Sequence, residues 1–219
     1  MMLIRAPGVY RPQADTRLLA RALADAAVAP HGRVLDMCTG TGALAIHAAS
    51  RIRPAALTAV DISRAALASA WLNCRMRGID IELLRGDIRK MLHDRRFDVV
   101  LANPPYVPAA SDGPARGAAR NWAAGSDGRD AVDAVCGLAP RVLSRTGMLL
   151  LVHSSLCGTD RTLTHLREGG LKAAVVARAT IPFGPVLRRQ ADRLARAGLI
   201  HPSQRHEELV VIRADRPRQ

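Results

Sequence analysis

The chain has 219 residues, of which 48% are apolar and 23% are charged, as in a single globular domain. This composition excludes disordered, collagen-like and coiled-coil proteins, and no apolar run approaches the roughly 18 residues that a membrane span requires. The formal net charge of +13 suits an acidic macromolecular partner, but 30 of the 32 cationic residues are arginine, which fits a compositional bias equally well.

Short apolar segments with strand character alternate with helical patterns along the chain. The predicted strands lie at 33–37, 56–61, 79–84, 97–102 and 148–152, and further strand and helix segments continue to 207–212. The main predicted helices lie at about 15–27, at 43–49, between Ser63 and Gly78, and at 130–142. This alternation predicts one α/β domain over residues 1–219, built on a doubly wound, mostly parallel sheet.

Two segments interrupt the alternation. Residues 1–32 precede the first strand and contain one amphipathic helix, so we expect them to form an entry segment. Residues 107–128 form a connection rich in Pro, Gly and Ala. A connection of this length in a compact domain is usually a lid or a binding loop, and a simple surface insertion is the alternative.

The cysteines indicate a reducing compartment. Cys38, Cys74, Cys136 and Cys157 form no Cys-x-x-Cys pair, and the first residues contain no apolar signal core. We therefore expect free thiols in a cytoplasmic protein that does not associate with membranes.

A glycine-rich turn follows the first predicted strand and opens a helix. This turn, Asp36–Gly42, allows a ligand to approach the backbone closely and directs a helix N-terminus at it. Asp61 follows 21 residues after Gly40, at the end of the second strand, where a carboxylate would bind a ribose. Two cofactors fit this pattern, a nicotinamide dinucleotide and S-adenosylmethionine.

Acidic residues at successive strand ends favour S-adenosylmethionine. Asp36 would repel a pyrophosphate but would attract an ammonium or sulfonium group, and Asp87 is placed to accept a hydrogen bond from an adenine amine. The Tyr-x-x-x-Lys pair that would serve a dehydrogenase is absent from the sequence. Helix capping is the alternative role for each carboxylate alone, but it does not account for three of them in register.

The sequence Asn103-Pro104-Pro105-Tyr106 directly follows the fourth predicted strand. An amide or exocyclic amine nitrogen is a poor nucleophile because its lone pair is delocalised. The Asn103 side-chain oxygen and the Pro104 carbonyl can accept both N–H protons in plane, which leaves the lone pair facing a methyl donor. The two prolines stiffen the loop, and Tyr106 offers a flat face to an amide or a base.

With this motif the chain resembles the class I S-adenosylmethionine-dependent methyltransferases that modify planar nitrogen. Tyr10–Thr16 and Gly125–Arg129 make it similar, within that class, to the protein-glutamine methyltransferases that act on the Gly-Gly-Gln motif of peptide-chain release factors. The resemblance implies a seven-stranded Rossmann-like sheet, S-adenosylmethionine as cofactor and a protein substrate such as a release factor. Only 32 residues precede the first strand, which implies the short form that lacks an N-terminal helical domain and works with a small activating partner protein.

The motifs and the resemblance together define the expected site. The expected catalytic residues are Asn103, Pro104, Pro105 and Tyr106. The residues expected to hold the cofactor are Asp15, Thr16, Asp36, Cys38, Thr39, Gly40, Gly42, Asp61, Ile62, Asp87, Ile88 and Asn103. No metal site is expected, because no predicted helix brings His201 and His206 together.

Cys38 departs from the family pattern, since it occupies the position of the first turn glycine. Because residues with a side chain rarely adopt positive φ, we expect the backbone at Cys38 to avoid that region. A reactive cysteine is disfavoured because no histidine or second cysteine lies nearby in the sequence to activate it.

Two other functions remain open from the sequence. Methylation of an exocyclic amine of adenine or guanine in RNA or DNA uses the same motif and would suit the net charge of +13. A nicotinamide-dependent dehydrogenase would account for the glycine turn and for Asp61.

A basic helical face is the last feature that bears on the substrate. In the segment 186–196 the helical period places four arginines on one side and apolar residues on the other. The four arginines are Arg188, Arg189, Arg193 and Arg196. With Arg116 and Arg120 of the long loop, this face would draw an acidic protein or an RNA toward Tyr106, and an ordinary solvated face is the alternative.

Overall fold

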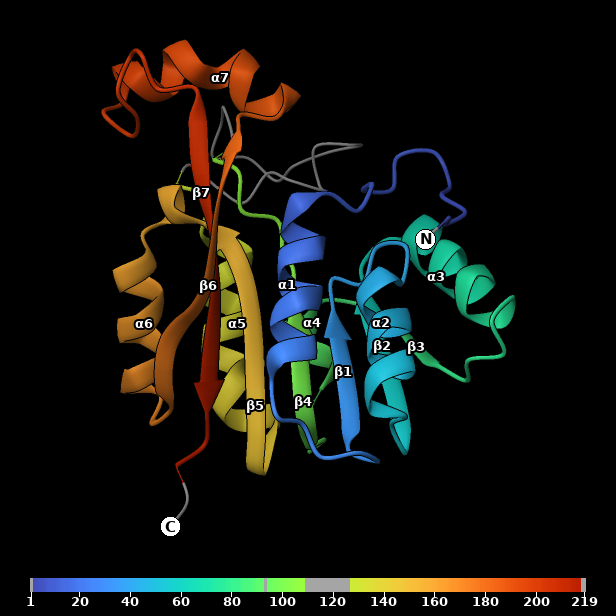
Figure 1. Cartoon of the computed structure of the whole chain (residues 1–219). Coiled ribbons are helices and arrows are strands. Elements are labelled where there is room, and N and C mark those ends of the chain that lie inside the picture. The colour runs from blue at the N-terminus through green and yellow to red at the C-terminus, as the bar shows by residue number, and fades with distance from the viewer. Residues whose placement is uncertain (1, 93, 109–126, 218–219) are drawn as a thin grey trace.

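The computed structural model describes residues 2–92, 94–108 and 127–217 (Figure 1). Among these residues, seven strands form one sheet in the order β3-β2-β1-β4-β5-β7-β6. The strands are β1 (Arg33–Met37), β2 (Ala56–Asp61), β3 (Glu82–Arg85), β4 (Phe97–Ala102), β5 (Leu143–Ser154), β6 (Lys172–Pro182) and β7 (His206–Asp215). Strands β1 to β5 are parallel, and β7 runs antiparallel to both β5 and β6. The predicted doubly wound, mostly parallel sheet is confirmed.

Helices cover both faces of this sheet. The described helices are α1 (Ala14–Asp25), α2 (Ala43–Ile52), α3 (Arg64–Arg75), α4 (Ile88–Met91), α5 (Asp130–Val142), the 3-10 turn η2 (Ser155–Cys157), α6 (Thr159–Glu168) and α7 (Pro185–Arg196). Leu19 of α1 and Leu44 of α2 are buried against one face, and Val135 of α5 and Leu166 of α6 against the other. In the described part of the chain, no helix has the length and apolar character needed to cross a membrane.

Most element boundaries follow the sequence prediction. The strands at 33–37, 56–61 and 97–102 occur where predicted, because their apolar residues are buried in the sheet. The helix at 130–142 also occurs where predicted, because its apolar residues recur at helical spacing and are buried on one side. Ser63 caps α3 as predicted, since its hydroxyl accepts a hydrogen bond of 3.3 Å from the N–H of Ala66.

The third strand is shorter than predicted and begins later. It comprises Glu82–Arg85 instead of residues 79–84. The chain reverses after α3 at Gly78, which has a φ of 64°, and the N–H of Ile79 donates to the carbonyl of Cys74 at 3.0 Å. This bond closes the C-terminus of α3, so Ile79 belongs to the helix cap and not to the sheet.

A helical insertion interrupts the hairpin formed by β6 and β7. Pro182 pairs with His206 at the last position of the ladder, and the N–H of Phe183 donates to the carbonyl of Arg205 at 2.8 Å. Strand β7 runs antiparallel to β5, and Ser154, the last residue of β5, pairs with Leu209. The first residues of β7 therefore extend past the carboxyl end of β5. Helix α7 therefore projects from the carboxyl edge of the parallel strands, at the top of Figure 1.

Arg129 is a buried cation at the start of α5. Its side chain is only 2% exposed, and its guanidinium donates to the carboxylate of Asp133 and to the carbonyl of Cys157. It also donates to the carbonyl of Gly158 and to the hydroxyl of Thr162, both at 3.1 Å. One side chain thus joins the first turn of α5 to η2 and α6.

We expect Arg129→Met to lower the free energy of unfolding by about 3–5 kcal/mol, because it leaves buried carbonyls and the Asp133 carboxylate without their cation. Urea unfolding measures this loss. Arg161→Met is the matched control, since Arg161 pairs with Asp127 at 3.0 Å on the surface and its loss should cost below about 1 kcal/mol. Equal losses in the two variants would contradict the role of Arg129.

Candidate active site

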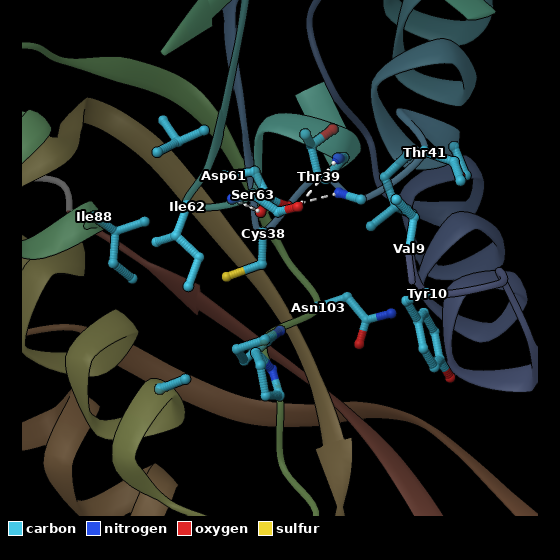
Figure 2. Close-up of a pocket in the computed structure, with 18 of the residues that line it drawn as sticks. Val9, Tyr10, Cys38, Thr39, Thr41, Asp61, Ile62, Ser63, Ile88 and Asn103 are labelled. Carbon is cyan, nitrogen blue, oxygen red and sulfur yellow. Dashed lines mark hydrogen bonds between the residues drawn. The ribbon is translucent and has the colours of Figure 1, made fainter. Parts of the chain in front are cut away.

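The carboxyl ends of β1, β2 and β4 border a pocket of about 470 Å³ (Figure 2). Its walls come from the N-terminal segment, the glycine turn, the segments after β2 and β3, and the loop after β4. The predicted site residues that line it are Asp15, Thr16, Cys38, Thr39, Gly40, Asp61, Ile62, Asp87, Ile88, Asn103, Pro104, Pro105 and Tyr106. The other two predicted residues, Asp36 and Gly42, do not line the pocket.

The glycine turn holds Cys38 in a left-handed conformation. Its φ is 58°, so the expectation that the backbone avoids positive φ at this position is wrong. The turn is fixed by the neighbouring strand: the N–H of Thr39 donates to the carbonyl of Val60 at 3.2 Å, and the N–H of Gly40 donates to the Asp61 carboxylate at 3.0 Å. These bonds offset the roughly 1–2 kcal/mol that a left-handed conformation costs an L residue.

The thiol of Cys38 points into the pocket (Figure 2). Burial raises its pKa strongly, and the nearby carboxylates of Asp61, Asp36 and Asp87 raise it further. The thiol is therefore protonated at neutral pH, and a protonated thiol is a weak nucleophile. This environment supports the expectation that Cys38 is not a reactive cysteine.

Gly42 supports the site through packing. Its φ is 78°, and a Cβ at this position would lie 3.1 Å from the Cα of Ala70 in α3. The absence of a side chain thus lets the start of α2 approach α3 closely.

Asp36 lies fully buried beneath the glycine turn. One of its carboxylate oxygens accepts hydrogen bonds from the Thr39 hydroxyl at 2.7 Å and from the N–H of Ala45 at 3.1 Å. The other oxygen has no hydrogen-bond partner among the described residues. Burial raises the pKa of this carboxyl to about 7. A positively charged group near the free oxygen would stabilise the carboxylate form.

Asp61 and Asp87 follow the ends of β2 and β3, as predicted. The Asp61 carboxylate accepts from the N–H groups of Gly40 at 3.0 Å and Ser63 at 2.9 Å, and burial raises its pKa. Asp87 caps α4 by accepting from the N–H of Arg89 at 2.9 Å, and it pairs with the Arg89 guanidinium at 3.3 Å. Asp87 therefore has the helix-cap geometry and also lines the pocket, so the two interpretations of this residue are compatible.

A buried carboxylate, that of Asp15, joins the N-terminal segment to the loop after β4. One of its oxygens accepts from the hydroxyls of Tyr10 at 2.9 Å and Tyr106 at 3.2 Å. The other accepts from the N–H and the hydroxyl of Thr16. Burial and the Asp15 charge raise the pKa of both tyrosines, so their hydroxyls stay protonated and act as donors.

Asn103 is oriented by the same group of residues. Its side-chain nitrogen donates to the Thr16 hydroxyl at 3.3 Å. Its side-chain oxygen accepts no hydrogen bond from the described residues and faces the pocket (Figure 2). An acceptor oxygen is thus available at the position where the sequence analysis expects the reacting nitrogen to bind.

The N-terminal segment forms one wall of the pocket, and only part of this wall was predicted from the sequence. Val9 and Tyr10 line the pocket, and neither was predicted to do so. The segment is held by Asn73 of α3, whose amide forms two bonds of 2.8 Å with the backbone of Ile4 and donates to the carbonyl of Thr41 at 3.0 Å. A polar residue on the buried face of a predicted helix was the sequence signal for this contact.

Other predicted features lie away from the pocket. His201 and His206 are exposed, and the His201 ring contacts the Ser203 hydroxyl at 2.7 Å. Over residues 2–92, 94–108 and 127–217, no cluster of three His, Cys, Asp or Glu side chains could hold a metal ion. Arg116, Arg120 and most of the expected lid lie outside the described residues.

We expect Asp36 to give the stability of the protein a distinct pH dependence. The folded state holds this proton more tightly than the unfolded state, so the free energy of unfolding should fall as the pH rises from about 4 to about 7. Asp36→Asn removes the titration, and its stability relative to the wild type should therefore increase by up to about 4 kcal/mol over that range. Urea unfolding at several pH values measures the difference, and a difference independent of pH would contradict the raised pKa.

Comparison with known proteins points to one family. Residues 1–116 match the family model described as "methyltransferase small domain". A relative from Methanocaldococcus jannaschii, described as a candidate protein N5-glutamine methyltransferase, is 31% identical over 190 residues. The match covers 86% of this chain and 93% of the relative.

Bacterial relatives are longer proteins. The ribosomal protein uL3 glutamine methyltransferase of Burkholderia pseudomallei is 37% identical over 155 residues, which are 64% of this chain and 49% of the relative. The release factor glutamine methyltransferase of Geobacter sulfurreducens is 31% identical over 152 residues, which are 66% of this chain and 53% of the relative. The chain therefore spans about half the length of these bacterial relatives.

A solved structure shares the fold. A chain of the E. cuniculi Mtq2–Trm112 complex, which is responsible for methylation of the eRF1 translation termination factor, matches with a TM-score of 0.65 and 23% identity. The match covers 96% of this chain and 99% of that chain. The predicted seven-stranded Rossmann-like sheet is thus one that a methyltransferase complex also contains.

Proposed function

The chain belongs to the methyltransferase small domain family, and from this we propose that it methylates the side-chain amide nitrogen of a glutamine in a protein, with S-adenosylmethionine as the methyl donor. Membership of this family makes the dehydrogenase alternative wrong. The observation that carries the proposal is the side-chain oxygen of Asn103, which accepts no hydrogen bond from the described residues and borders the pocket that the glycine turn also lines.

S-adenosylmethionine carries a transferable methyl group on a sulfonium, together with an ammonium group, a ribose and an adenine. The described residues offer a polar group for each of these parts. Asp61 and Asp87 line the pocket and suit the ribose hydroxyls and the adenine amine. Asp36 lies beneath the glycine turn, outside the lining, and its oxygen that has no partner among the described residues suits a positive charge acting from the pocket. A Cβ built at Gly40 would meet no atom within 4 Å, which indicates open space for a ligand next to the backbone.

The loop after β4 would prepare the acceptor nitrogen. An amide has its lone pair delocalised, and accepting both of its N–H protons in plane turns the out-of-plane electrons toward the methyl donor. Asn103 supplies one acceptor with its side-chain oxygen, and the carbonyl of Pro104 supplies the second. Asp15 acts as a positioning residue, because its bonds to Tyr106 and Thr16 hold the loop after β4 in place. We call the described part of this loop, residues 103–108, the acceptor loop. Positioning of this kind accounts for about 7–11 kcal/mol in oriented model reactions.

The names of the relatives support a glutamine in a protein of the translation apparatus. We take a peptide-chain release factor as the substrate, because Tyr10–Thr16 and Gly125–Arg129 resemble the motifs of the enzymes that act on its Gly-Gly-Gln sequence. Such a substrate would place the enzyme in the cytoplasm. Likeness to the Mtq2–Trm112 complex extends the proposal to a small activating partner protein.

Methylation of an exocyclic amine in RNA or DNA is the second candidate, because Asn103 and Pro104 can hold an amine as they hold an amide. Transfer of a labelled methyl group into a cell lysate, separated into protein, RNA, DNA and small-molecule fractions, distinguishes the two. Label on a glutamine of a protein supports the proposal. Label confined to a nucleic-acid fraction would overturn it in favour of the second candidate.

We expect Asp61→Ala to weaken S-adenosylmethionine binding at least tenfold. The change removes charge-assisted hydrogen bonds to the ribose, each of which contributes about 1.5–3 kcal/mol. Titration calorimetry measures the affinity. Because Asp61 also accepts from Gly40 and Ser63, Asp61→Asn serves as a control that keeps one acceptor oxygen, and its melting temperature shows whether the turn survives. Tight binding of NADH without binding of the methyl donor would contradict the assignment of this pocket.

Asn103→Ala separates binding from chemistry. Because Asn103 is assigned to the acceptor nitrogen, the variant should retain its affinity for S-adenosylmethionine and lose more than nine tenths of the turnover rate. Rates on a release factor and calorimetry with the cofactor measure the two quantities. A variant that keeps more than about a tenth of the wild-type rate, a loss below about 1.4 kcal/mol, would show that the role of Asn103 is misassigned.

A further inference from the structure

Residues 183–205, which we call the basic cap, lie at the carboxyl edge of the sheet (Figure 1). They pack against Val107, which lines the pocket. They contain five arginines and one aspartate, so their formal net charge is +4 with His201 neutral. The basic cap thus combines a concentrated positive charge with a fixed place next to the site.

The inner side of the basic cap is anchored to the acceptor loop. Its buried residues pack against Val107, which directly follows Tyr106, and against Leu156 of η2. These buried residues are Phe183, Leu187, Leu194 and Ile200. The Arg193 guanidinium donates to the carbonyl of Pro108 at 3.1 Å, so Arg193 is half-buried and belongs to the anchor. The prediction that Arg193 lies on an exposed face with the other three arginines is therefore wrong.

The outer side of the basic cap carries four exposed arginines and one exposed carboxylate, that of Asp192. Its exposed arginines are Arg188, Arg189, Arg196 and Arg205. Within the part of the chain that the structure describes, no carboxylate forms an ion pair with any of them. Among the described residues, the hydrogen bonds that Arg196 and Arg205 donate go to backbone carbonyls of the cap itself.

We propose that the outer side of the basic cap is the docking surface for an acidic region of the protein that carries the acceptor glutamine. The inference rests on the proposed function, because it assumes a protein substrate at the pocket. The anchor to Val107 and Pro108 places a docked partner next to Tyr106. An acidic protein surface fits better than RNA, because single-stranded RNA is held largely by stacking and the cap's one aromatic residue, Phe183, is 2% exposed.

The test compares two substrates that share one acceptor. The first is a purified bacterial release factor, and the second is a short Gly-Gly-Gln peptide that lacks the rest of its surface. The variant is Arg188→Glu with Arg189→Glu. Arg141→Glu with Arg145→Glu is the matched control, because it makes the same charge change at exposed residues of the opposite, amino edge of the sheet. Methyl transfer gives KM and kcat for each protein with each substrate.

In the cap variant we expect KM for the release factor to rise at least tenfold at about 0.02 M salt and to return to within about threefold of the wild type at about 0.5 M. Its KM for the peptide, its kcat and its affinity for S-adenosylmethionine should stay at wild-type values. The control variant should match the wild type with both substrates. Arg188→Ala with Arg189→Ala should show a smaller rise of the same sign, which excludes damage by the introduced glutamates.

The outcomes separate the docking surface from the proposed function. Unchanged KM for the release factor at low salt would overturn the docking surface alone, and a lowered KM would overturn it by indicating a cationic partner. Loss of transfer-RNA binding in the cap variant, with KM for the release factor unaltered, would assign the surface to nucleic acid and also overturn it. If the wild type methylates neither the peptide nor the release factor, the proposed function fails and the docking surface fails with it.

Discussion

The parallel pairing of β1 with β4 determines where this protein can do chemistry. Met37 lies opposite Ala102, so the chain leaves the sheet at neighbouring points into the glycine turn and into Asn103. Met37 also lies opposite Val60 of β2, which places Asp61 beside the same turn. The parallel register thus brings together the glycine turn, the Asp61 carboxylate and the side chain of Asn103 from three distant stretches of sequence.

The sequence predicts well what depends on local pattern and poorly what depends on contacts across the molecule. Strands β1, β2 and β4 were predictable because each is a short apolar run buried in the sheet. Most of the pocket residues were predictable because they lie at or just after the ends of β1 to β4, whereas Asp15 and Thr16 were expected only from the family resemblance. The positive φ of Cys38 was not predictable, since it is imposed by bonds to residues of β2. The wall formed by Val9 and Tyr10 was missed for the same reason, because it depends on Asn73 of α3.

Carboxylates gather near the pocket of a chain whose formal net charge is +13. Asp15 and Asp61 line the pocket, and Asp36 lies fully buried beneath the glycine turn. Burial leaves these three carboxylates with few water contacts, so they act strongly on a ligand inside the pocket and weakly on a partner outside it. Arg64, Arg85 and Arg89 line the same pocket, so its lining carries charges of both signs.

Asn73 has a practical consequence for anyone who attaches a probe to this protein. Its side chain bonds both to Ile4 and to Thr41, so the first residues of the chain and the glycine turn are ordered by one amide. An affinity tag or dye joined near the N-terminus would lie a few residues from the bonds that hold a wall of the pocket. Strand β7 ends opposite Met148, near the start of β5, so the chain leaves the sheet at the far edge (Figure 1). The C-terminal end is thus the side on which to immobilise or label this protein.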